Sequence, residues 1–238
     1  MLPTRKEPHP PRIRPVPMTC DDAISTKIPD PLPKGCFRML VIGAPGSGKT
    51  SLATSLLLKN GAYHRVFDRI HVVQPSNSRA SYAKDPWAKH RRVYDDLTPE
   101  LLERVLGEAK SLAADDKHSL LFIDDFAYTL KDRKIERLLS ECFFNARHAH
   151  LSTIIVSQTL RSVPDKLRKS ASHVILFSPA NRVEAKIAAE ELLFLDTATA
   201  ATLFEQAFKE RFDFMLIDTQ RRRVWRNFDE EIELPRAF

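Results

Sequence analysis

The stretch from Gly43 to Thr50 constrains what this chain can fold into more than any other. It reads Gly-Ala-Pro-Gly-Ser-Gly-Lys-Thr, a spacing typical of a loop whose backbone N–H groups surround a phosphate. The apolar run 37–42 before the loop suits a buried strand, and apolar residues at helical spacing follow it. The order strand, glycine-rich loop, helix places a phosphate at the N-terminus of a helix.

The residue types in this loop match a nucleoside triphosphate and its metal ion. Lys49 is expected to reach the β- and γ-phosphates, and the Thr50 hydroxyl is expected to bind Mg²⁺. We therefore expect ATP and Mg²⁺ as cofactors. The residues expected to bind the nucleotide are contiguous in the chain: Gly43, Ala44, Pro45, Gly46, Ser47, Gly48, Lys49, Thr50 and Ser51.

A pair of carboxylates forms the second part of the expected site. Asp124 and Asp125 follow the apolar run 120–123, and an open α/β sheet binds its ligands at the carboxyl ends of the strands. Mg²⁺ prefers few carboxylates together with waters and phosphate oxygens. We expect Asp124 to bind the metal and Asp125 to orient and polarise the attacking water. The alternative is that one or both acids cap the next turn.

A polar residue also ends the β-branched strand expected at 151–157. The Gln158 amide can donate a hydrogen bond to the γ-phosphate and orient water, so it would report whether the γ-phosphate is present. A glutamine at a strand end is common, so this hypothesis depends on the two stronger motifs.

The composition is that of one basic globular domain. The chain has 238 residues, of which 43% are hydrophobic, enough for one sizeable α/β core. The net charge of +6 favours a polyanionic partner without proving one. The three cysteines lie far apart and show no metal-ligand spacing, which favours a reducing compartment. There is no apolar run long enough for a membrane span and no signal-peptide core, so we expect a soluble intracellular protein.

Strands and helices alternate through the middle of the chain. This order predicts an α/β fold with a mainly parallel sheet flanked by helices. Helices are expected directly after the glycine-rich loop, from Thr98 onward, and over 132–147, 181–193 and 197–209. The expected strands of the parallel region are 37–42, 69–74, 120–123, 151–157 and 173–177.

The two ends of the chain differ from the domain between them. Residues 1–35 hold nine of the sixteen prolines, so we expect a basic arm that is extended or disordered. The domain itself is expected over 36–230, closed by a C-terminal β-hairpin from 212–217 and 223–228, with an acidic tail at 231–238. The long polar loop 75–96 is expected to be functional or disordered.

Together these motifs resemble the P-loop NTPases of the FtsK–HerA superfamily, which pump DNA. Within it the chain looks like the genome-packaging ATPases of double-stranded DNA viruses, the poxvirus-like packaging family. Many superfamily members carry Asp-Glu where this chain has Asp-Asp at 124–125. The resemblance covers about residues 37–228 and is carried by the segments 43–50, 120–125, 147–158 and 163–169.

The resemblance implies several properties that the spacing alone does not. The strand before Gln158 should lie between the strand before the phosphate loop and the strand before Asp124. The protein should form a homo-oligomeric ring that hydrolyses ATP, translocates double-stranded DNA into a capsid and contacts a capsid or vertex protein. Its place would be the infected cell, in the cytoplasm or a viral factory, or the virion.

An arginine from a neighbouring subunit can stabilise the charge that builds up on the γ-phosphate oxygens, an effect worth about 10³ to 10⁵ in rate. Arg147 is the first candidate, because the family's trans-acting arginine also precedes the strand that ends in the sensor residue. Arg168 is the second candidate and Arg161 the third. Each of the three can instead be a surface arginine. His148 and His150 are expected to be structural, with no metal-ligand set around them.

Basic clusters are the candidates for contact with DNA, although each can equally be a solvated surface. Such contacts would go mainly to phosphates, because a packaging motor has to ignore base sequence. Two aromatic residues of the long loop, Tyr82 and Trp87, either pack on DNA or a neighbour or anchor the loop. The candidate basic residues are Lys89, Arg91, Arg92, Lys166, Lys169, Arg221, Arg222 and Arg223.

Three other readings stay open from the sequence alone. A nucleoside or small-molecule kinase would share the phosphate loop, but it would need a mobile lid and an acceptor pocket. A scaffold with a vestigial nucleotide site would not need the intact Lys49, Thr50, Asp124 and Asp125. Another ATPase, such as a plasmid or secretion motor, is the third.

Overall fold

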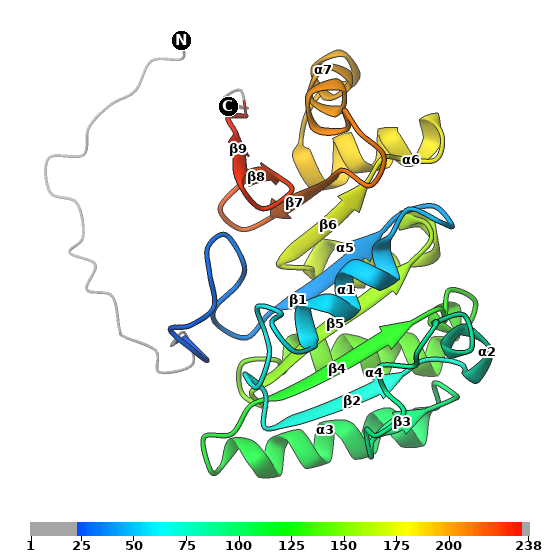
Figure 1. Ribbon diagram of the computed structural model, residues 1–238, viewed down its shortest axis with the longest axis vertical. Helices are drawn as coiled ribbons and strands as arrows, with labels where there is room; N and C mark the ends of the chain where they lie inside the picture. Colours follow the sequence, from blue (N-terminus) through cyan, green and yellow to red (C-terminus); the bar gives the residue numbers. More distant parts are fainter. Residues whose placement is uncertain (1–22, 235–238) are drawn as a thin grey trace, which may run out of the picture.

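One nine-stranded sheet runs through the molecule (Figure 1). Residues 23–234 are described by the structure, a computed structural model of the chain. The strand order is β3-β2-β4-β5-β1-β6-β7-β8-β9, in which the first six strands are parallel and the last three are antiparallel to their neighbours. The strands are β1 (Arg38–Ile42), β2 (Arg69–Val73), β3 (Val93–Tyr94), β4 (Ser119–Asp124), β5 (Leu151–Ser157), β6 (His173–Phe177), β7 (Phe214–Asp218), β8 (Arg223–Arg226) and β9 (Glu230–Ile232).

Two of the helices expected from the sequence begin at side-chain caps, Thr98 and Asn181. The Thr98 side chain accepts a hydrogen bond from the backbone of Leu101, and the Asn181 side chain caps the helix that follows it. None of the helices within residues 23–234 is long and apolar enough to cross a bilayer. The helices are α1 (Lys49–Leu57), α2 (Ser76–Arg79), α3 (Pro99–Ala113), α4 (Arg133–Phe144), α5 (Asp165–Ser170), α6 (Arg182–Ile187) and α7 (Thr197–Ala207), with short 3₁₀ turns η2 (Thr129–Lys131) and η3 (Leu160–Ser162) and a π-helical segment η4 (Ala188–Leu193).

The sheet separates two apolar cores, as the period of two along a buried strand requires. In β1, Leu40 and Ile42 point into the core formed with α3, α4, α5, η4 and α7. Met39 and Val41 point into the opposite core, formed with α1 and the loops around it. The predicted α/β class with helices on both faces is therefore confirmed.

The strand order brings the predicted site elements together. β5 lies between β1 and β4, as the family resemblance implies, with Ile42 beside Ser157 and Asp124 beside Val156. All three strands run in the same direction, so the loop after β1, the acids at the end of β4 and Gln158 after β5 meet at one edge of the sheet. We call it the carboxyl edge.

The packed domain extends beyond the expected boundaries at both ends. Ile28 and Leu32 are buried in the α1-side core, and Tyr63 donates a hydrogen bond to the carbonyl of Pro33. The predicted arm 1–35 is therefore wrong for its last part, while residues 1–22 lie outside the described residues. The predicted hairpin is present as β7 and β8, but Glu230–Ile232 adds a further strand across the expected start of the tail.

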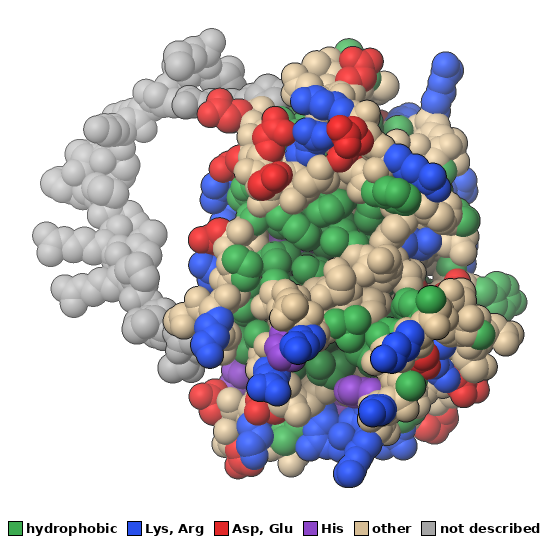
Figure 2. Space-filling model, in the orientation of Figure 1, with side chains coloured by type: hydrophobic (Ala, Val, Ile, Leu, Met, Phe, Trp, Pro, Cys, Tyr) green, Lys and Arg blue, Asp and Glu red, His purple; other side chains and the backbone are tan. Residues whose placement is uncertain are grey.

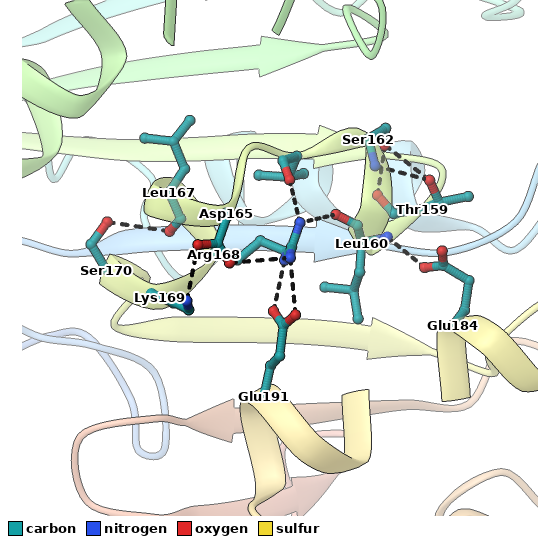
Figure 3. Close-up of polar contacts among 11 residues, drawn as sticks. Thr159, Leu160, Ser162, Asp165, Leu167, Arg168, Lys169, Ser170, Glu184 and Glu191 are labelled. Carbon is teal, nitrogen blue, oxygen red and sulfur yellow. Dashed lines mark hydrogen bonds and ion pairs between the residues drawn. The ribbon is translucent and has the colours of Figure 1, made fainter. Parts of the chain in front are cut away.

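A polar network fixes the segment directly after β5 (Figure 3). The Arg168 guanidinium binds both carboxylate oxygens of Glu191 at 2.8 and 3.0 Å and donates to the carbonyl of Val163 at 2.7 Å. Glu184, from α6, accepts a hydrogen bond from the backbone N–H of Leu160 at 2.6 Å. The network holds the chain after Gln158 against α6 and η4, and so positions one wall of the carboxyl edge.

We expect Arg168→Ala to lower the free energy of unfolding by about 3 kcal/mol, because a largely buried carboxylate loses its partner and a carbonyl loses its donor. Urea unfolding measures the change. Arg161→Ala removes an exposed arginine from the same segment and should change stability by less than about 0.5 kcal/mol. Equal effects of the two substitutions would contradict the bracing role of Arg168.

Candidate active site

The loop after β1 has the backbone shape that a bound phosphate needs. Gly46 and Gly48 adopt φ angles of 76° and 95°, which are open to glycine at little cost. Gly43 is held so closely that an added Cβ would lie 2.5 Å from Ser47 Oγ and 2.8 Å from Phe177 Cβ. The curled backbone ends at Gly48, which caps α1, so its N–H groups converge at a helix N-terminus.

Thr50 and Asp124 meet beside this loop. Thr50 and Asp124 line the same cavity, and the Thr50 hydroxyl lowers the pKa of the Asp124 carboxylate, which is 3% exposed. Gln74 Nε2 donates to Asp124 Oδ2 at 3.0 Å. A hydroxyl and a carboxylate that face one another are hard oxygen ligands of the kind Mg²⁺ prefers. These two residues therefore fit the predicted metal site, and the glycine-rich loop fits the predicted phosphate.

Burial tunes the charges in this site. Loss of solvent raises the pKa of Asp124 to about 6, although the Thr50 hydrogen bond and the Lys49 charge act in the opposite direction. Loss of solvent also lowers the pKa of Lys49, while Asp124 and Asp125 raise it. A divalent cation would neutralise the carboxylate charge of Asp124, and a polyphosphate would neutralise the ammonium charge of Lys49.

Asp125 and Gln158 border a cavity of about 350 Å³ that also contains Lys49, Thr50 and Asp124. Asp125 has a φ of 67°, and Ser78 Oγ donates to its Oδ2 at 2.5 Å. Asp125 is exposed, whereas Asp124 is buried. The cavity thus collects the phosphate loop, both acids and the strand-end amide that the sequence predicts for one site.

No role was predicted for Gln74, and the loop 75–96 was expected to be functional or disordered rather than part of the nucleotide site. Gln74 is fully buried at the end of β2, and its side chain also bonds Tyr82. Arg79, from α2, forms ion pairs with Asp85 and Asp95, so the loop is folded over the site. The sequence did contain a signal for Gln74. Like Gln158, it is a polar residue directly after an apolar strand.

The two leading arginine candidates lie in different places. Arg168 is fully engaged by Glu191 and by backbone carbonyls of its own chain, so the structure gives it a bracing role and argues against its predicted catalytic one. Arg147 is exposed in the turn before β5, on the wall of a separate cavity of about 860 Å³. That turn lies at the edge opposite the carboxyl edge.

Several other predicted residues have structural partners. Trp87 is buried against Phe122, with ring centroids 5.8 Å apart, and Tyr82 bonds Gln74 and Thr54, so both anchor the long loop. Arg223 is bound to Glu231 by two hydrogen bonds. The remaining candidates for DNA contact that are exposed are Lys89, Arg91, Lys166, Lys169, Arg221 and Arg222.

One histidine assignment needs correction. Asp116 and His118 approach His150 so closely that their ligand atoms all lie within 4.8 Å of one another. The prediction that no metal-ligand set surrounds His150 is therefore wrong. The sequence could not reveal the set, because 31 residues separate His118 and His150 and the sheet brings them together.

The ionised Asp124 carboxylate should cost stability when neither metal nor nucleotide is present. Its pKa of about 6 in the folded protein lies above the ordinary value of 3.8. The cost is therefore absent below about pH 4, grows as pH rises and is complete above about pH 6, where it reaches about 3 kcal/mol. We expect Asp124→Asn to raise the free energy of unfolding at pH 7 by up to that amount.

Urea unfolding in EDTA at pH 7 and pH 4 measures this difference. The gain from Asp124→Asn should disappear at pH 4, where the native carboxyl is already protonated. Asp125→Asn changes an exposed carboxylate and serves as the matched control with little effect. A gain that persists at pH 4 would show that ionisation is not its cause.

Solved structures with the same fold include viral packaging enzymes and secretion ATPases. The DNA-packaging ATPase B204 of Sulfolobus turreted icosahedral virus superimposes with a TM-score of 0.61 at 19% identity, covering 79% of this chain and 95% of that one. The genome packaging NTPase B204 of Sulfolobus turreted icosahedral virus 2, in complex with ATP-gammaS, gives 0.59 at 16% identity over 80% and 96%. The type VII secretion protein EccC of Thermomonospora curvata gives 0.54 at 16% identity over 84% and 37%.

Sequence comparisons lead to a viral family. An uncharacterised protein, 015R, of Frog virus 3 is 27% identical over 154 residues, and the match spans 62% of this chain but 45% of that protein. The family model described as "Poxvirus A32 protein" matches residues 29–193, well over half of the chain and all of the residues that form the cavity at the carboxyl edge. The chain therefore belongs to the poxvirus A32 protein family.

Proposed function

We propose that this protein is the ATP-hydrolysing subunit of a motor that translocates double-stranded DNA into a viral capsid. The observation that carries the proposal is the cavity that Thr50 and Asp124 share beside the curled glycine-rich loop. The loop would supply hydrogen-bond donors to the phosphates, and the two side chains would supply ligands to the metal ion, all in one cavity. Membership of the A32 family and the shared fold with B204, a DNA-packaging ATPase, support DNA as the substrate of the motor.

The site would hold Mg²⁺-ATP through residues already in position. The backbone N–H groups of 43–50 would bind the β- and γ-phosphates, and Lys49 would neutralise their charge. Thr50 and Asp124 would hold Mg²⁺, which draws charge from the phosphate oxygens when it is bound. Gln74 keeps the Asp124 carboxylate oriented through its hydrogen bond, as the partners of metal-binding carboxylates do.

Hydrolysis needs a water aligned with the γ-phosphate. Asp125 lies on the cavity wall and would accept a hydrogen bond from that water. Gln158 lies on the same wall and would donate to a γ-phosphate oxygen. Loss of the γ-phosphate would remove that bond, so Gln158 would distinguish ATP from ADP and pass the difference to the segment after β5.

One subunit cannot bring Arg147 to its own nucleotide. The turn before β5 and Gln158 after it are separated by the seven residues of that strand, which span about 20 Å. We propose that Arg147 acts on the nucleotide of a neighbouring subunit in a homo-oligomeric ring. An exposed arginine at the edge opposite the site is the arrangement that such a ring requires.

The basic side chains of one subunit are dispersed. On the face shown in Figure 2, Lys and Arg side chains form several separate groups around a central apolar region. We propose that exposed basic residues of several subunits together contact DNA phosphates in the ring, without base readout. A capsid or vertex protein is the proposed second partner, and the infected cell, in its cytoplasm or a viral factory, or the virion is the proposed place of action.

Mixing two inactive variants tests both the site and the ring. Lys49→Ala should lose measurable ATP hydrolysis, because the phosphates lose their main cation. Arg147→Ala should still bind ATP but lose at least about 10³-fold in turnover. A mixture of the two should regain activity, because a Lys49→Ala subunit can supply Arg147 to the intact site of its neighbour. Phosphate release with and without double-stranded DNA is the measurement.

Arg133→Ala removes an exposed arginine of α4 and is the matched control, with turnover near that of the unmodified protein. Wild-type turnover in Arg147→Ala would place the trans-acting group elsewhere. Normal hydrolysis in Lys49→Ala would overturn the assignment of the site, and hydrolysis that ignores DNA would argue against a DNA motor.

A further inference from the structure

An exposed aromatic ring stands next to the phosphate loop. Phe212 is 55% exposed and lies in the segment between α7 and β7. Its Cδ1 would be 3.3 Å from a Cβ added at Gly48, the residue that caps α1. The catalytic steps described above do not use this ring.

The structure holds Phe212 in an unfavourable state. Its φ is 81°, a left-handed conformation that costs a bulky residue about 1–3 kcal/mol. Asp213 fixes this conformation, because its Oδ2 accepts hydrogen bonds from the backbone N–H groups of Lys209 and Glu210, each at 2.9 Å. An exposed phenyl ring on a strained but braced backbone is typical of a ligand contact.

The position of the ring matches one part of a nucleotide. Asp124 and Gln158 lie on the β4 and β5 side of the phosphate loop, so the γ-phosphate would point that way. The rest of the nucleotide must leave the loop in another direction. Phe212 lies on the opposite side, directly before β7, and a Cβ added at Gly48 would lie close to both Phe212 and Phe177 of β6.

We propose that Phe212 and Arg211 form a stacking platform for the base of a purine nucleoside triphosphate, an inference that rests on the proposed function. The Arg211 guanidinium carbon lies 4.7 Å from the centroid of the Phe212 ring. A planar cation over an aromatic ring offers two flat surfaces to a base. Stacking carries no donor and acceptor code, so adenine and guanine nucleotides should bind with similar affinity.

Inorganic tripolyphosphate separates the base from the phosphates in a test. The full-length protein is titrated with ATPγS and with tripolyphosphate, each with Mg²⁺, by isothermal calorimetry. Phe212→Ala should lower the affinity for ATPγS by about tenfold, the typical effect of one lost stacking contact. The affinity for tripolyphosphate should stay unchanged. Phe212→Gly should do the same, and glycine is compatible with the left-handed backbone, so this variant guards against a folding defect.

Phe194 is the matched control. It is 54% exposed, has a φ of 54° and lies under Arg222 at 5.2 Å, but it is at the end of η4. Phe194→Ala should leave both affinities unchanged. An unaltered ratio of ATPγS to tripolyphosphate affinity in both Phe212 variants would overturn the platform while leaving the phosphate site intact. If the unmodified protein bound neither ligand, the nucleotide site and the platform would both be wrong.

A second inference comes from the opposite edge of the sheet and does not depend on the first. Asp116 and His118 lie in the turn between α3 and β4, and His150 lies in the turn before β5. The two imidazole rings are parallel within 7° and 4.6 Å apart, and His150 Nδ1 is 3.6 Å from Asp116 Oδ1. The Nδ1 atoms of both histidines are buried and have no hydrogen-bond partner within the described part of the chain.

Buried nitrogens without partners are costly unless a ligand satisfies them. We infer that Asp116, His118 and His150 bind a transition-metal ion of the Zn²⁺ type, since two imidazoles and one carboxylate suit such ions better than Mg²⁺ or Ca²⁺. Rotation of the two imidazoles out of their stacked arrangement would bring the ligand atoms, now within 4.8 Å of one another, to coordination distance. The ion would join two turns, one of which carries Arg147.

Zn²⁺ binding to the full-length, nucleotide-free protein is measured by calorimetry, with Co²⁺ absorption as a direct probe of the ligands. One bound ion per chain is expected in excess Mg²⁺. His118→Ala and His150→Asn should each weaken binding at least about tenfold, since even the loss of an outer partner weakens a metal site that much. Asparagine tolerates the left-handed φ of 44° at position 150.

His148→Ala removes an exposed histidine from the same turn and should leave the affinity unchanged. Equal Zn²⁺ affinity of the unmodified protein and His118→Ala would overturn the site, as would the absence of binding to the unmodified protein. A loss that was equal in His148→Ala would assign the ion to the surface of the turn instead.

Discussion

The common direction of the parallel strands is the constraint on which the rest of the structure depends. Gln74, Asp124 and Gln158 lie at the carboxyl ends of β2, β4 and β5, and the phosphate loop follows β1, so their functional groups meet at one edge. The strand register pairs Asp124 with Val156 and Ile42 with Ser157. This register sets where along the edge each functional group lies. A register shift of one residue in β4 would exchange the faces of Asp124 and Asp125.

The site is assembled at the expense of local stability. Asp124 is ionisable yet buried, the φ angles of Asp125 and Phe212 are left-handed, and Gln74 Oε1 has no hydrogen-bond partner in the described part of the chain. Such features persist where the surrounding structure fixes them. Here two large cores hold the strands from both sides, and the Arg168–Glu191 pair fixes the segment after β5.

Local patterns predicted the parts of the fold that depend on short-range signals. The glycine-rich loop, the alternating elements, and the caps at Thr98 and Asn181 could all be recognised from the sequence, because each depends on a few adjacent residues. The burial of Ile28 and Leu32 and the folding of the loop 75–96 were not, because they depend on distant partners such as Tyr63 and Phe122. The pairing of Arg168 with Glu191 was inaccessible for the same reason, since the two residues lie 23 positions apart.

The carboxyl edge of the sheet carries the proposed nucleotide site, and the opposite edge carries the proposed trans-acting Arg147. Strand β5 connects the two. This strand is buried along its whole length between β1 and β4, so it can move only as a unit with its neighbours. A displacement of Gln158 by the γ-phosphate would therefore reach the turn that carries Arg147. Each edge also presents an exposed aromatic residue, Tyr128 three residues after Asp125 and Phe144 three residues before Arg147. Aromatic residues are enriched where subunits meet, so contact between the two edges would cover both rings and complete the site.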